Sequence, residues 1–494
     1  MIATHLPVLQ IVIPLVAAPL CWLLRKGDLA WALSLLVSLA ALAISAVLLS
    51  QVLAHGPISY ELGGWAPPWG IEYRIDVLNA FVLLIVSAIG AVTIPYTRRS
   101  IADELPASQL GGFYTALLLC LTGLLGVAIT GDAFNLFVFL EISSLSSYVL
   151  IAMGRDRRAL TAAFQYLVMG TIGATFIVIG IGLLYMATGT LNMADLSARI
   201  PALGANRTVI IAFAFLTVGA TLKLALFPLH FWLPNAYAYA PSAVTAFLAA
   251  TATKVSIYIL LRFFYTIFGP VFQAEDLTLH SLFIPLAVIA VLVCSTVAIF
   301  QINVKRMLAY SSIAQIGYMM IGIGFDTVTG LTAGIVHLFN HAVTKGGLFM
   351  ALGCIVLRIG TSQIDDLAGL GRRMPLTMFA FVLGGLSLIG VPLTAGFVSK
   401  WYLVQAAIEL DDWVVAAAIL GGSLLAVIYV WRVVEVAYLR PAPAGAPDRV
   451  IEAPWSMLVP TYILIGASIY FGVETSLNVG VARTAAQFLL GVAP

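Results

Sequence analysis

Residues 222–254 read LKLALFPLHFWLPNAYAYAPSAVTAFLAATATK, and this stretch indicates a membrane fold with an interrupted helix. Lys223 and Lys254 stand near its two ends, and most of the residues between them are apolar. Pro228 and Pro234 follow the first lysine, and because proline removes a backbone donor they predict a break in the helix. An ionised side chain at the centre of a bilayer costs about 2.5 kcal/mol or more, so lysines kept inside apolar sequence indicate a chemical role.

The whole chain has the composition of an integral membrane protein. Of its 494 residues 62% are hydrophobic and 9% are charged, and its mean hydropathy is +1.05. Soluble domains carry about 25% charged residues. The net charge of +2 is not gathered into a basic run, so nothing indicates a nucleic-acid partner. No positive residue precedes the first apolar run, and we therefore expect a transmembrane helix there and not a cleaved signal peptide.

The sequence offers no pattern for a cofactor or a structural metal. The four cysteines stand singly in apolar stretches, without C-x-x-C spacing, and are expected to be small core residues: Cys21, Cys120, Cys294 and Cys354. No P-loop, dinucleotide fingerprint, haem-ligand pattern or nucleophile elbow occurs. We therefore expect no cofactor and no redox centre in this chain.

Fourteen segments approach the length of about 20 apolar residues that a membrane helix needs. They predict an all-α polytopic membrane protein without a soluble domain. The predicted spans are 6–24, 30–53, 77–97, 111–130, 133–153, 162–187, 208–228, 241–266, 281–302, 308–325, 330–357, 375–408, 414–438 and 455–473.

The distribution of arginine and lysine between the loops predicts the orientation. Fourteen lie in odd-numbered loops: Arg25, Lys26, Arg98, Arg99, Arg155, Arg157, Arg158, Lys305, Arg306, Arg358, Arg372, Arg373, Arg440 and Arg449. Five lie in even-numbered loops and the C-terminal tail: Arg74, Arg199, Arg207, Arg262 and Arg483. We therefore expect a multi-pass protein of the cytoplasmic (inner) membrane with both termini outside. The longest outer connection, 54–76, has room only for a hairpin or a capping loop.

Two predicted spans cannot be simple helices. An unbroken helix over 375–408 would be about 50 Å long, whereas the bilayer core is about 30 Å thick. The run GVPLTAG at 390–396 supplies a break, just before Lys400. A lysine beside a proline interruption thus occurs twice, and paired interruptions are typical of the repeated halves of membrane transporters.

Glu141 is a carboxylate inside an apolar span. It follows Asp132 by nine residues, which places it about 13 Å along span five. No counter-charge stands near it in the sequence, so a buried partner is expected, and Lys223 is the natural candidate. Burial disfavours a charged lysine and a neighbouring carboxylate favours it. The pair is therefore either a static contact that fixes helix packing or a contact whose opening changes the lysine's affinity for a proton.

His337, His341 and Lys345 follow one another at intervals of four residues. On a helix they form one stripe with steps of about 6 Å, and histidine is well suited to proton relay. A zinc site is the weaker interpretation, because Leu338 replaces the glutamate of the H-E-x-x-H pattern and no thiol is near. Hydrogen-bonded core histidines are a further alternative.

The remaining ionisable residues differ in how strongly they indicate function. Lys254 is expected near mid-membrane, too deep to snorkel easily, and Lys400 at the second break completes the set. His230, beside Pro228, is either another relay group or an interfacial ring. Two further sets are expected to be interfacial or boundary residues: Glu435 paired with Arg432, and Arg74 with Asp76.

Five motifs carry a resemblance to a known family. In chain order they are GDAFNLFVFLEISSLSSYVLI (131–151), LKLALFPLHFWLPNAYAYAPSAVTAFLAATATK (222–254), KRMLAYSSIAQIGYM (305–319), HLFNHAVTKGGLFM (337–350) and GVPLTAGFVSKW (390–401). As an ordered set they resemble the antiporter-like subunits shared by multisubunit Mrp cation/proton antiporters, respiratory complex I and membrane-bound hydrogenases.

The resemblance implies fourteen helices built on two inverted five-helix repeats, with helices seven and twelve broken. The implied division of the chain is N-terminal helices in 1–110, a first repeat in 111–266, a second repeat in 281–438, and helix fourteen with a tail in 455–494.

The resemblance also implies roles for the buried residues. Glu141 and Lys223 would form a modulating pair, and Lys254 would be the central relay. His337 and His341 would lie in a hydrated axis that leads to Lys400.

Within the family, the chain resembles the D-type Mrp antiporter protein most. Its length excludes the long lateral helix of the L-type complex I protein and the extended C-terminus of the A-type Mrp protein. The M-type complex I protein typically has glutamate where Lys400 stands. FNLFVFLE at 134–141, followed by SSYVLI, is most similar to the D-type Mrp protein, whereas the N-type complex I protein and the hydrogenase counterpart also carry the lysine and stay open.

We therefore expect a secondary-transporter subunit rather than an enzyme, with protons and Na+ as the transported ions. Protons would pass along a relay of buried groups: Glu141, Lys223, Lys254, His337, His341, Lys345 and Lys400. Its partners would be the lipid bilayer and other hydrophobic subunits of the complex. The alternatives are the proton-pumping arm of a redox complex and a scaffold with static ion pairs.

Overall fold

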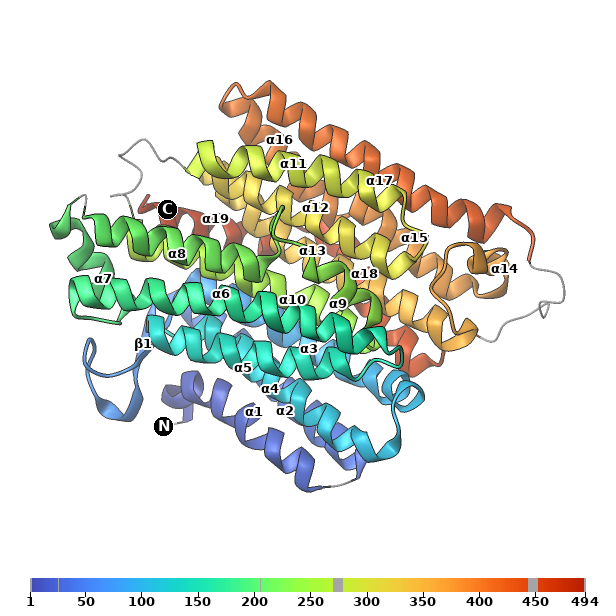
Figure 1. The fold of residues 1–494 in the computed structure, drawn as a ribbon, viewed down its shortest axis with the longest axis horizontal. Helices are drawn as coiled ribbons and strands as arrows, with labels where there is room; N and C mark the ends of the chain where they lie inside the picture. Colours follow the sequence, from blue (N-terminus) through green and yellow to red (C-terminus); the bar gives the residue numbers. More distant parts are fainter. Residues whose placement is uncertain (1, 25, 205, 270–278, 443–451, 493–494) are drawn as a thin grey trace.

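The chain forms a bundle of long helices with a common direction (Figure 1). The computed structural model describes residues 2–24, 26–204, 206–269, 279–442 and 452–492. Among these residues thirteen helices are long and apolar enough to cross a membrane, and each coincides with a predicted span. The remaining predicted span, 375–408, is divided between two helices of 15 residues each. The expectation of an all-α membrane protein with fourteen crossings is thereby confirmed.

The N-terminal part of the chain, up to residue 104, contains three long helices and a β-hairpin. The helices are α1 (Leu6–Leu23), α2 (Gly27–His55) and α3 (Val77–Glu104). Between α2 and α3, strands β1 (Ile58–Glu61) and β2 (Glu72–Ile75) pair antiparallel with Ile58 opposite Ile75, so 54–76 forms a hairpin, one of the two arrangements expected there. Asp76 then caps α3 by accepting hydrogen bonds from the backbone N–H groups of Leu78 and Asn79.

Two units of similar organisation follow. The first contains α4 (Leu110–Ile129), α5 (Ala133–Ala152), α6 (Arg158–Thr188), α7 (Met193–Arg199), α8 (Arg207–Leu224), α9 (Trp232–Tyr239), α10 (Ser242–Leu261) and the π-helical turn η5 (Arg262–Phe268). The second contains α11 (Leu279–Ile299), α12 (Val304–Gly324), α13 (Val328–Ile359), α14 (Leu370–Arg373), α15 (Pro375–Ile389), α16 (Ala395–Glu409) and α17 (Trp413–Leu439).

Each unit contains one broken helix, at the place where the prolines and glycines predict it. In the first unit α8 ends where Ala225 turns to φ 60°, and the chain resumes as α9. In the second unit α15 ends where Gly390 turns to φ 92°, and the chain resumes as α16. A backbone with positive φ cannot continue a right-handed helix, so both breaks expose helix ends inside the bundle.

A pair of matching β-bridges supports an internal repeat. Asp132 pairs with Asn192, and Asn303 pairs with Gln363, so the two bridges connect the same places in the two units. Asp132 and Asn303 also cap the helices that follow them, α5 and α12. The first bridge adjoins α7 and the second lies near α14, and these helices are at opposite ends of the bundle (Figure 1). The two units therefore run in opposite directions.

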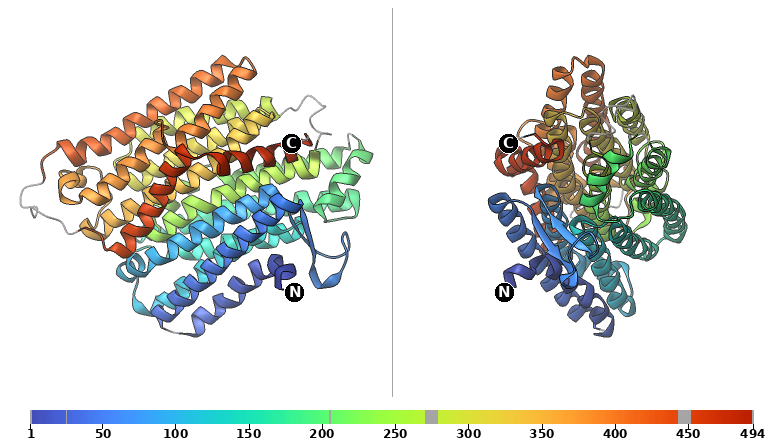
Figure 2. Two further views of the ribbon diagram at one scale, coloured as in Figure 1. Left: turned by 180° about the vertical axis from the view of Figure 1, so that it is seen from behind. Right: turned by 90° about the vertical axis from the view of Figure 1, so that its left-hand side faces the viewer.

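Helix α13 occupies the centre of the molecule. Every residue from Gly330 to Ile355 is buried, and α13 packs against α10, α12, α16 and the C-terminal helices α18 (Trp455–Val473) and α19 (Ser476–Leu490). Figure 2 shows these two C-terminal helices crossing the back of the bundle. The hydropathy pattern does not predict α19 as a separate element of the tail.

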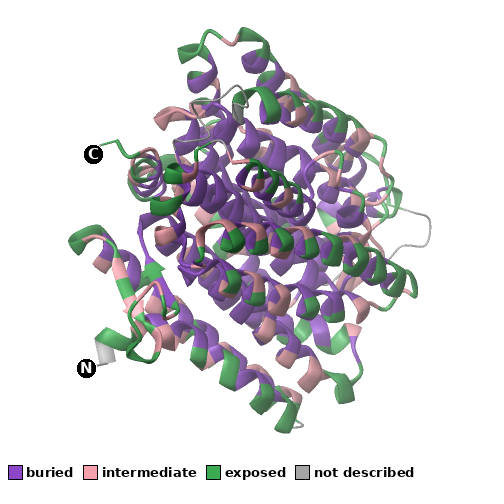
Figure 3. Ribbon diagram, turned by 60° about the vertical axis from the view of Figure 1, so that its left-hand side comes forward, coloured by how far each residue is buried: buried purple, intermediate pink, exposed green. Residues whose placement is uncertain are grey.

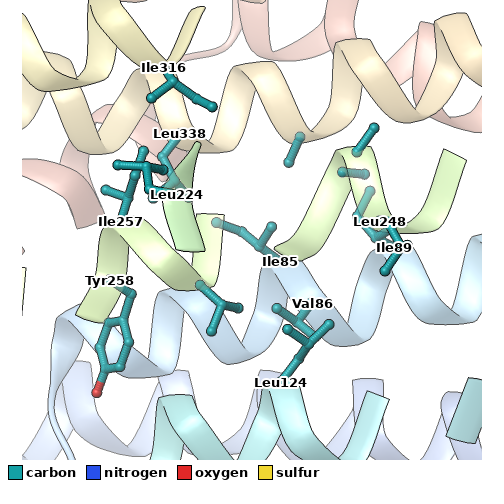
Figure 4. Packing of buried hydrophobic residues seen from close by; sticks show 14 of the residues in the cluster. Ile85, Val86, Ile89, Leu124, Leu224, Leu248, Ile257, Tyr258, Ile316 and Leu338 are labelled. Carbon is teal, nitrogen blue, oxygen red and sulfur yellow. The ribbon is translucent and has the colours of Figure 1, made fainter. Parts of the chain in front are cut away.

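Burial separates inner from peripheral helices (Figure 3). In the most apolar windows of α10 and α12, 94% of the residues are buried, compared with 39% in α1, α2 and α6. Apolar side chains from α3, α4, α8, α10, α12 and α13 fill the interior together (Figure 4). The exposed apolar residues of the outer helices suit contact with lipid or with other subunits. The four cysteines are buried and free, as expected.

Candidate functional site

Glu141 and Lys223 meet at the first helix break. The ammonium group of Lys223, in the last turn of α8, donates to Glu141 Oε1 at 3.1 Å and to Ser144 Oγ at 2.8 Å. The lysine side chain is 2% exposed and the glutamate side chain 25%. Both acceptors come from one face of α5, so this helix supplies the counter-charge that the sequence predicted.

The break next to this pair is held by an aromatic anchor. Trp232, the first residue of α9, donates its indole N–H to the backbone carbonyl of Leu222 at 3.0 Å. Its ring also stacks on Tyr166 of α6, with 3.9 Å between the centroids. This contact fixes the end of α8 and therefore the position of the lysine beside it.

Lys254 lies in the middle of α10 and is completely buried. Its ammonium group donates to the carbonyl of Ala249 at 2.5 Å and to Thr253 Oγ1 at 3.3 Å. Among the described residues it forms no ion pair with a carboxylate. A charge on this lysine is therefore stabilised only by a backbone dipole and a hydroxyl group, which suits a group that exchanges its proton.

The two histidines of α13 lie with their rings parallel, at 6.2 Å between centroids. The His337 ring nitrogens are hydrogen-bonded to Ser399 Oγ at 2.7 Å and to Gln315 Oε1 at 2.9 Å. The nitrogens of His341 have no hydrogen-bonding partner among the described side chains, although the residue is buried. Both nitrogens of His337 are thus engaged by other helices, which argues against a metal ion held by the two histidines together.

Lys345 continues the stripe on α13 toward α12. It donates to the carbonyl of Leu308 at 2.8 Å and to the hydroxyl group of Ser311. Ser311 lies one turn before Gln315 on α12, so the two residues present polar groups to the same stripe of α13.

Lys400 lies against the second helix break. Its ammonium group donates to the carbonyls of Leu388 and Ile389, at 3.1 and 2.8 Å, and to Ser423 Oγ at 3.0 Å. It also stands 4.8 Å from the centroid of the Tyr318 ring. The carbonyls at the end of α15 have no partner within their own helix, so the lysine caps that helix. The partial negative charge of these carbonyls in turn stabilises the ammonium group.

The structure thus brings together some of the predicted groups and separates others. Glu141 and Lys223 form a direct pair, and Ser399 links His337 to the helix that carries Lys400. Among the described residues no hydrogen bond joins one buried lysine to another or to a histidine. The predicted line of groups is therefore a series of stations and not a continuous chain of contacts.

Sequence reasoning missed the neutral side chains between these stations. The signal was present as hydroxyl and amide groups inside otherwise apolar spans. In the structure these groups form hydrogen bonds with the buried lysines and with His337, and they belong to Ser144, Ser311, Gln315, Ser399 and Ser423.

His230 is neither a clear relay group nor an exposed interfacial ring. It is buried, and it stacks between Phe227 and Phe231 with centroid distances of 5.2 and 4.9 Å. Its Nδ1 has no hydrogen-bonding partner among the described residues. The nearest further ring is that of Tyr310 on α12, at 6.3 Å.

The expected ion pair between Glu435 and Arg432 does not form. Glu435 contacts Arg440 at 3.5 Å and not Arg432, which donates to the carbonyls of Ile299 and Gln301 at the end of α11. An exposed ion pair contributes little stability, whereas carbonyls at a helix end need a partner, so the arginine is used there.

Asp76 lies at the start of α3, as expected of a boundary residue, and there it meets Arg262. They form a buried ion pair between α3 and the end of α10, with 2.6 Å between Asp76 Oδ1 and the guanidinium group. This pair lies 186 residues apart in the chain, so no local pattern could reveal it.

Comparisons with known proteins agree on the family. The model described as "NADH:quinone oxidoreductase/Mrp antiporter, TM" matches residues 130–426. The chain is 44% identical over 477 residues to the N-type protein of the NADH-quinone oxidoreductase of Desulforudis audaxviator, covering 93% of this chain and 94% of that protein. It is 30% identical to the D-type protein of the Na(+)/H(+) antiporter of Bacillus subtilis, covering 98% and 97%.

The fold of this chain matches that of a solved structure over almost its whole length. A chain of the membrane-bound sulfane sulfur reductase, described as an archaeal respiratory membrane complex, superposes with a TM-score of 0.91 at 30% identity. The match covers 98% of both chains. The similar proteins therefore belong to multisubunit membrane complexes of more than one kind.

Proposed function

The chain belongs to the NADH:quinone oxidoreductase/Mrp antiporter membrane family, and on that premise we propose that it translocates protons within a multisubunit cation/proton antiporter, with Na+ as the cation. The observation that carries the proposal is the buried Glu141–Lys223 pair at the end of a broken helix. Further buried lysines on α10, α13 and α16 have only neutral partners among the described residues. A static scaffold would not need them.

The Glu141–Lys223 pair would control the first step. In the closed pair the carboxylate stabilises the ammonium group. Separating the two would leave a charged amine without a counter-charge in a low-dielectric interior, which favours release of its proton. Ser144, the second acceptor, would keep the neutral amine hydrogen-bonded.

The released proton would then move between stations. Lys254, His341, His337 and Lys400 are buried groups that can each hold a proton. Because no hydrogen bond joins these stations directly, each transfer would require a side-chain movement or intervening water. The carbonyl groups at the second break would favour a protonated Lys400 at the end of the series.

We place this protein in the cytoplasmic membrane, with the odd-numbered loops inside and both termini outside. The excess of arginine and lysine in the odd-numbered loops supports this orientation. The N- and C-terminal ends lie at the same end of the bundle (Figure 1), as an even number of crossings requires.

A second candidate is the proton-pumping arm of a redox-driven complex. It is favoured by the 44% identity to a protein named as part of an NADH-quinone oxidoreductase, compared with 30% for the antiporter protein. The membrane chemistry proposed for this chain would be the same in both assemblies, and only the source of energy would differ.

The test is proton movement in everted vesicles. The chain would be expressed with its neighbouring genes in cells that lack Na+/H+ antiporters, and Na+-induced pH changes would be compared for wild type and Lys223→Ala at matched complex levels. A sodium response that is lost in the variant supports the antiporter. Retained transport in an assembled Lys223→Ala complex would contradict the proposed role of this lysine.

Composition of the purified complex separates the two candidates. Small hydrophobic subunits without a cofactor would support the cation antiporter. No sodium response from an intact complex, together with bound iron–sulfur proteins, would move the assignment to the redox-driven arm.

A further inference from the structure

A second buried ion pair lies outside the proposed relay. Arg262 donates to Asp76 Oδ1 at 2.6 Å, and both side chains are at most 5% exposed. The guanidinium group also donates to Tyr258 Oη at 2.9 Å and to Thr266 Oγ1 at 3.2 Å. The Tyr258 hydroxyl in turn donates to the carbonyl of Ala128 on α4 at 2.9 Å. The pair therefore ties α3, α4 and α10 together.

Residues of this network line a pocket at one end of the bundle. The pocket has a volume of about 250 Å³, and its lining includes Arg74, Asp76, Tyr258 and Arg262. Its other lining residues come from positions 130–131, from α7, from η5 and from α19, which belong to the end that we place outside. Solvent in this pocket would reach the ion pair directly.

The same network lies on the helix that carries Lys254. Lys254, Tyr258 and Arg262 follow at intervals of four residues on α10 and its continuation η5, so they share a face with steps of about 6 Å. The ammonium group of Lys254 points back toward Ala249, away from Tyr258. Ile257, the residue before Tyr258, lies with Leu224 and Leu338 in the buried apolar interior (Figure 4).

The opposite end of α10 meets a second pocket. The backbone N–H of Ser242, its first residue, donates to both carboxylate oxygens of Glu104 at 3.1 Å. Glu104 and Lys305 line a pocket of about 290 Å³ that is formed by odd-numbered loops. One helix therefore runs from a pocket at one end of the bundle to a pocket at the other, with Lys254 between them.

We propose that Asp76, Arg262 and Tyr258 form a gate between Lys254 and the outer pocket. In the closed arrangement, hydrogen bonds hold Arg262 against Asp76 and Tyr258, so that the three side chains would fill the route, and the apolar side chains packed around α10 would exclude water. Separation of the pair would open a passage from Lys254 to the outside through the first unit. The π-helical turn that begins at Arg262 supports this role, because such turns occur frequently at functional sites. The gate rests on the proposed function, since it presumes that Lys254 carries protons.

The experiment measures passive proton flux through the intact complex in proteoliposomes, without Na+ and with an imposed pH difference. The gate variants are the charge-free double substitution Asp76→Asn/Arg262→Gln and the single substitution Tyr258→Phe. The matched control is Asp195→Asn/Arg199→Gln, which removes a more exposed ion pair at the same end of the bundle. Each variant is also combined with Lys254→Ala.

The double variant should raise the passive flux about tenfold, which corresponds to about 1.4 kcal/mol in the barrier. Tyr258→Phe should raise it less, because the ion pair remains, and the control should leave it unchanged. Combination with Lys254→Ala should abolish the increase, which distinguishes an opened gate from a leak through damaged protein.

Unchanged flux in the assembled gate variants, or an increase that survives Lys254→Ala, would overturn the gate. If the double variant does not assemble, Tyr258→Phe decides by the same two criteria. Sodium-driven transport in the wild-type complex is measured in parallel with Lys254→Ala alone. Driven transport that does not depend on Lys254 would refute the relay, whereas driven transport that depends on it, with unchanged passive flux in the gate variants, would refute only the gate.

Discussion

The two helix breaks have the same architecture and different electrostatics. At the first, Lys223 ends the helix that precedes the break and faces the carboxylate of Glu141. At the second, Lys400 belongs to the helix that follows the break and faces two carbonyl groups, a hydroxyl group and an aromatic ring. A full counter-charge can be withdrawn by moving one side chain, whereas backbone dipoles at a helix end move only with the helix. The first break is therefore suited to switching and the second to holding a proton.

The largest expected effect follows from the counter-charge. Lys223→Ala or Glu141→Ala should abolish transport, because each removes one half of the pair that would control the first step. Transport in vesicles at matched complex levels checks this. The control is Lys26→Ala, which removes an exposed lysine from a loop. Transport at the wild-type rate in either pair variant would mean that the two breaks do not differ in function.

A smaller difference between the two breaks is expected in how much each lysine contributes to stability. Lys223→Met should lower the unfolding free energy by about 2–3 kcal/mol, somewhat less than for a fully buried pair, because Glu141 remains partly exposed. Adding Glu141→Gln should recover part of the loss. Lys400→Met leaves no carboxylate behind and should cost about 1–2 kcal/mol, because it leaves carbonyl groups unpaired.

Thermal unfolding of the purified complex measures both. An equal loss for Lys223→Met and Lys400→Met, without recovery in the double variant, would show that Glu141 contributes no counter-charge.

A moderate effect is expected where α13 meets the second break. Ser399→Ala removes the hydrogen bond to His337 Nδ1 and should reduce transport a few-fold without affecting assembly. Ser146→Ala is the control, because among the described residues this buried hydroxyl group donates only to the carbonyl of Ile142 in its own helix. Initial rates of proton movement provide the comparison. Equal rates for the two variants would show that the contact between His337 and the second break does not contribute to transport.

The smallest effect is expected for an ion pair outside the membrane. Hydrogen bonds from Arg158 lower the pKa of Asp156, so this carboxylate stays ionised well below neutral pH. Its contribution to stability is complete above the ordinary aspartate pKa and is lost only as the pH falls through the lowered value. Asp156→Asn should therefore leave the pH profile of transport unchanged around neutral pH. A shifted profile would show that loop charges, and not the breaks, control proton uptake.

The sequence predicted the spans and the breaks because hydropathy and proline are local signals. It predicted the Glu141–Lys223 pair by elimination, since neither residue has a counter-charge nearby on its own helix. The same reasoning failed for Asp76 and Arg262, because each stood at a span boundary where a charge needs no partner. It also failed for Arg432, where distant carbonyl groups outcompete a neighbouring carboxylate.

The neighbours of each buried group could not be predicted. Spacing along α13 places His337, His341 and Lys345 on one stripe, but which neighbours they meet depends on the packing of α12 and α16. His337 and His341 look alike in sequence, yet one is hydrogen-bonded on both nitrogens and the other on neither among the described residues.

The two β-bridges have a mechanical consequence. The Asp132–Asn192 bridge fastens the start of α7, the short helix that leads to α8, and the Asn303–Gln363 bridge fastens the segment that leads through α14 to α15. Among the described residues no such bridge holds α9 or α16, the arms that follow the breaks. Lys400 belongs to α16, so a movement of this arm would carry it away from its carbonyl partners on α15. The partners of Lys223 lie on α5, so the same movement of α9 would leave the first pair in place. Amide hydrogen exchange that is faster in α9 and α16 than in α8 and α15 would register this asymmetry.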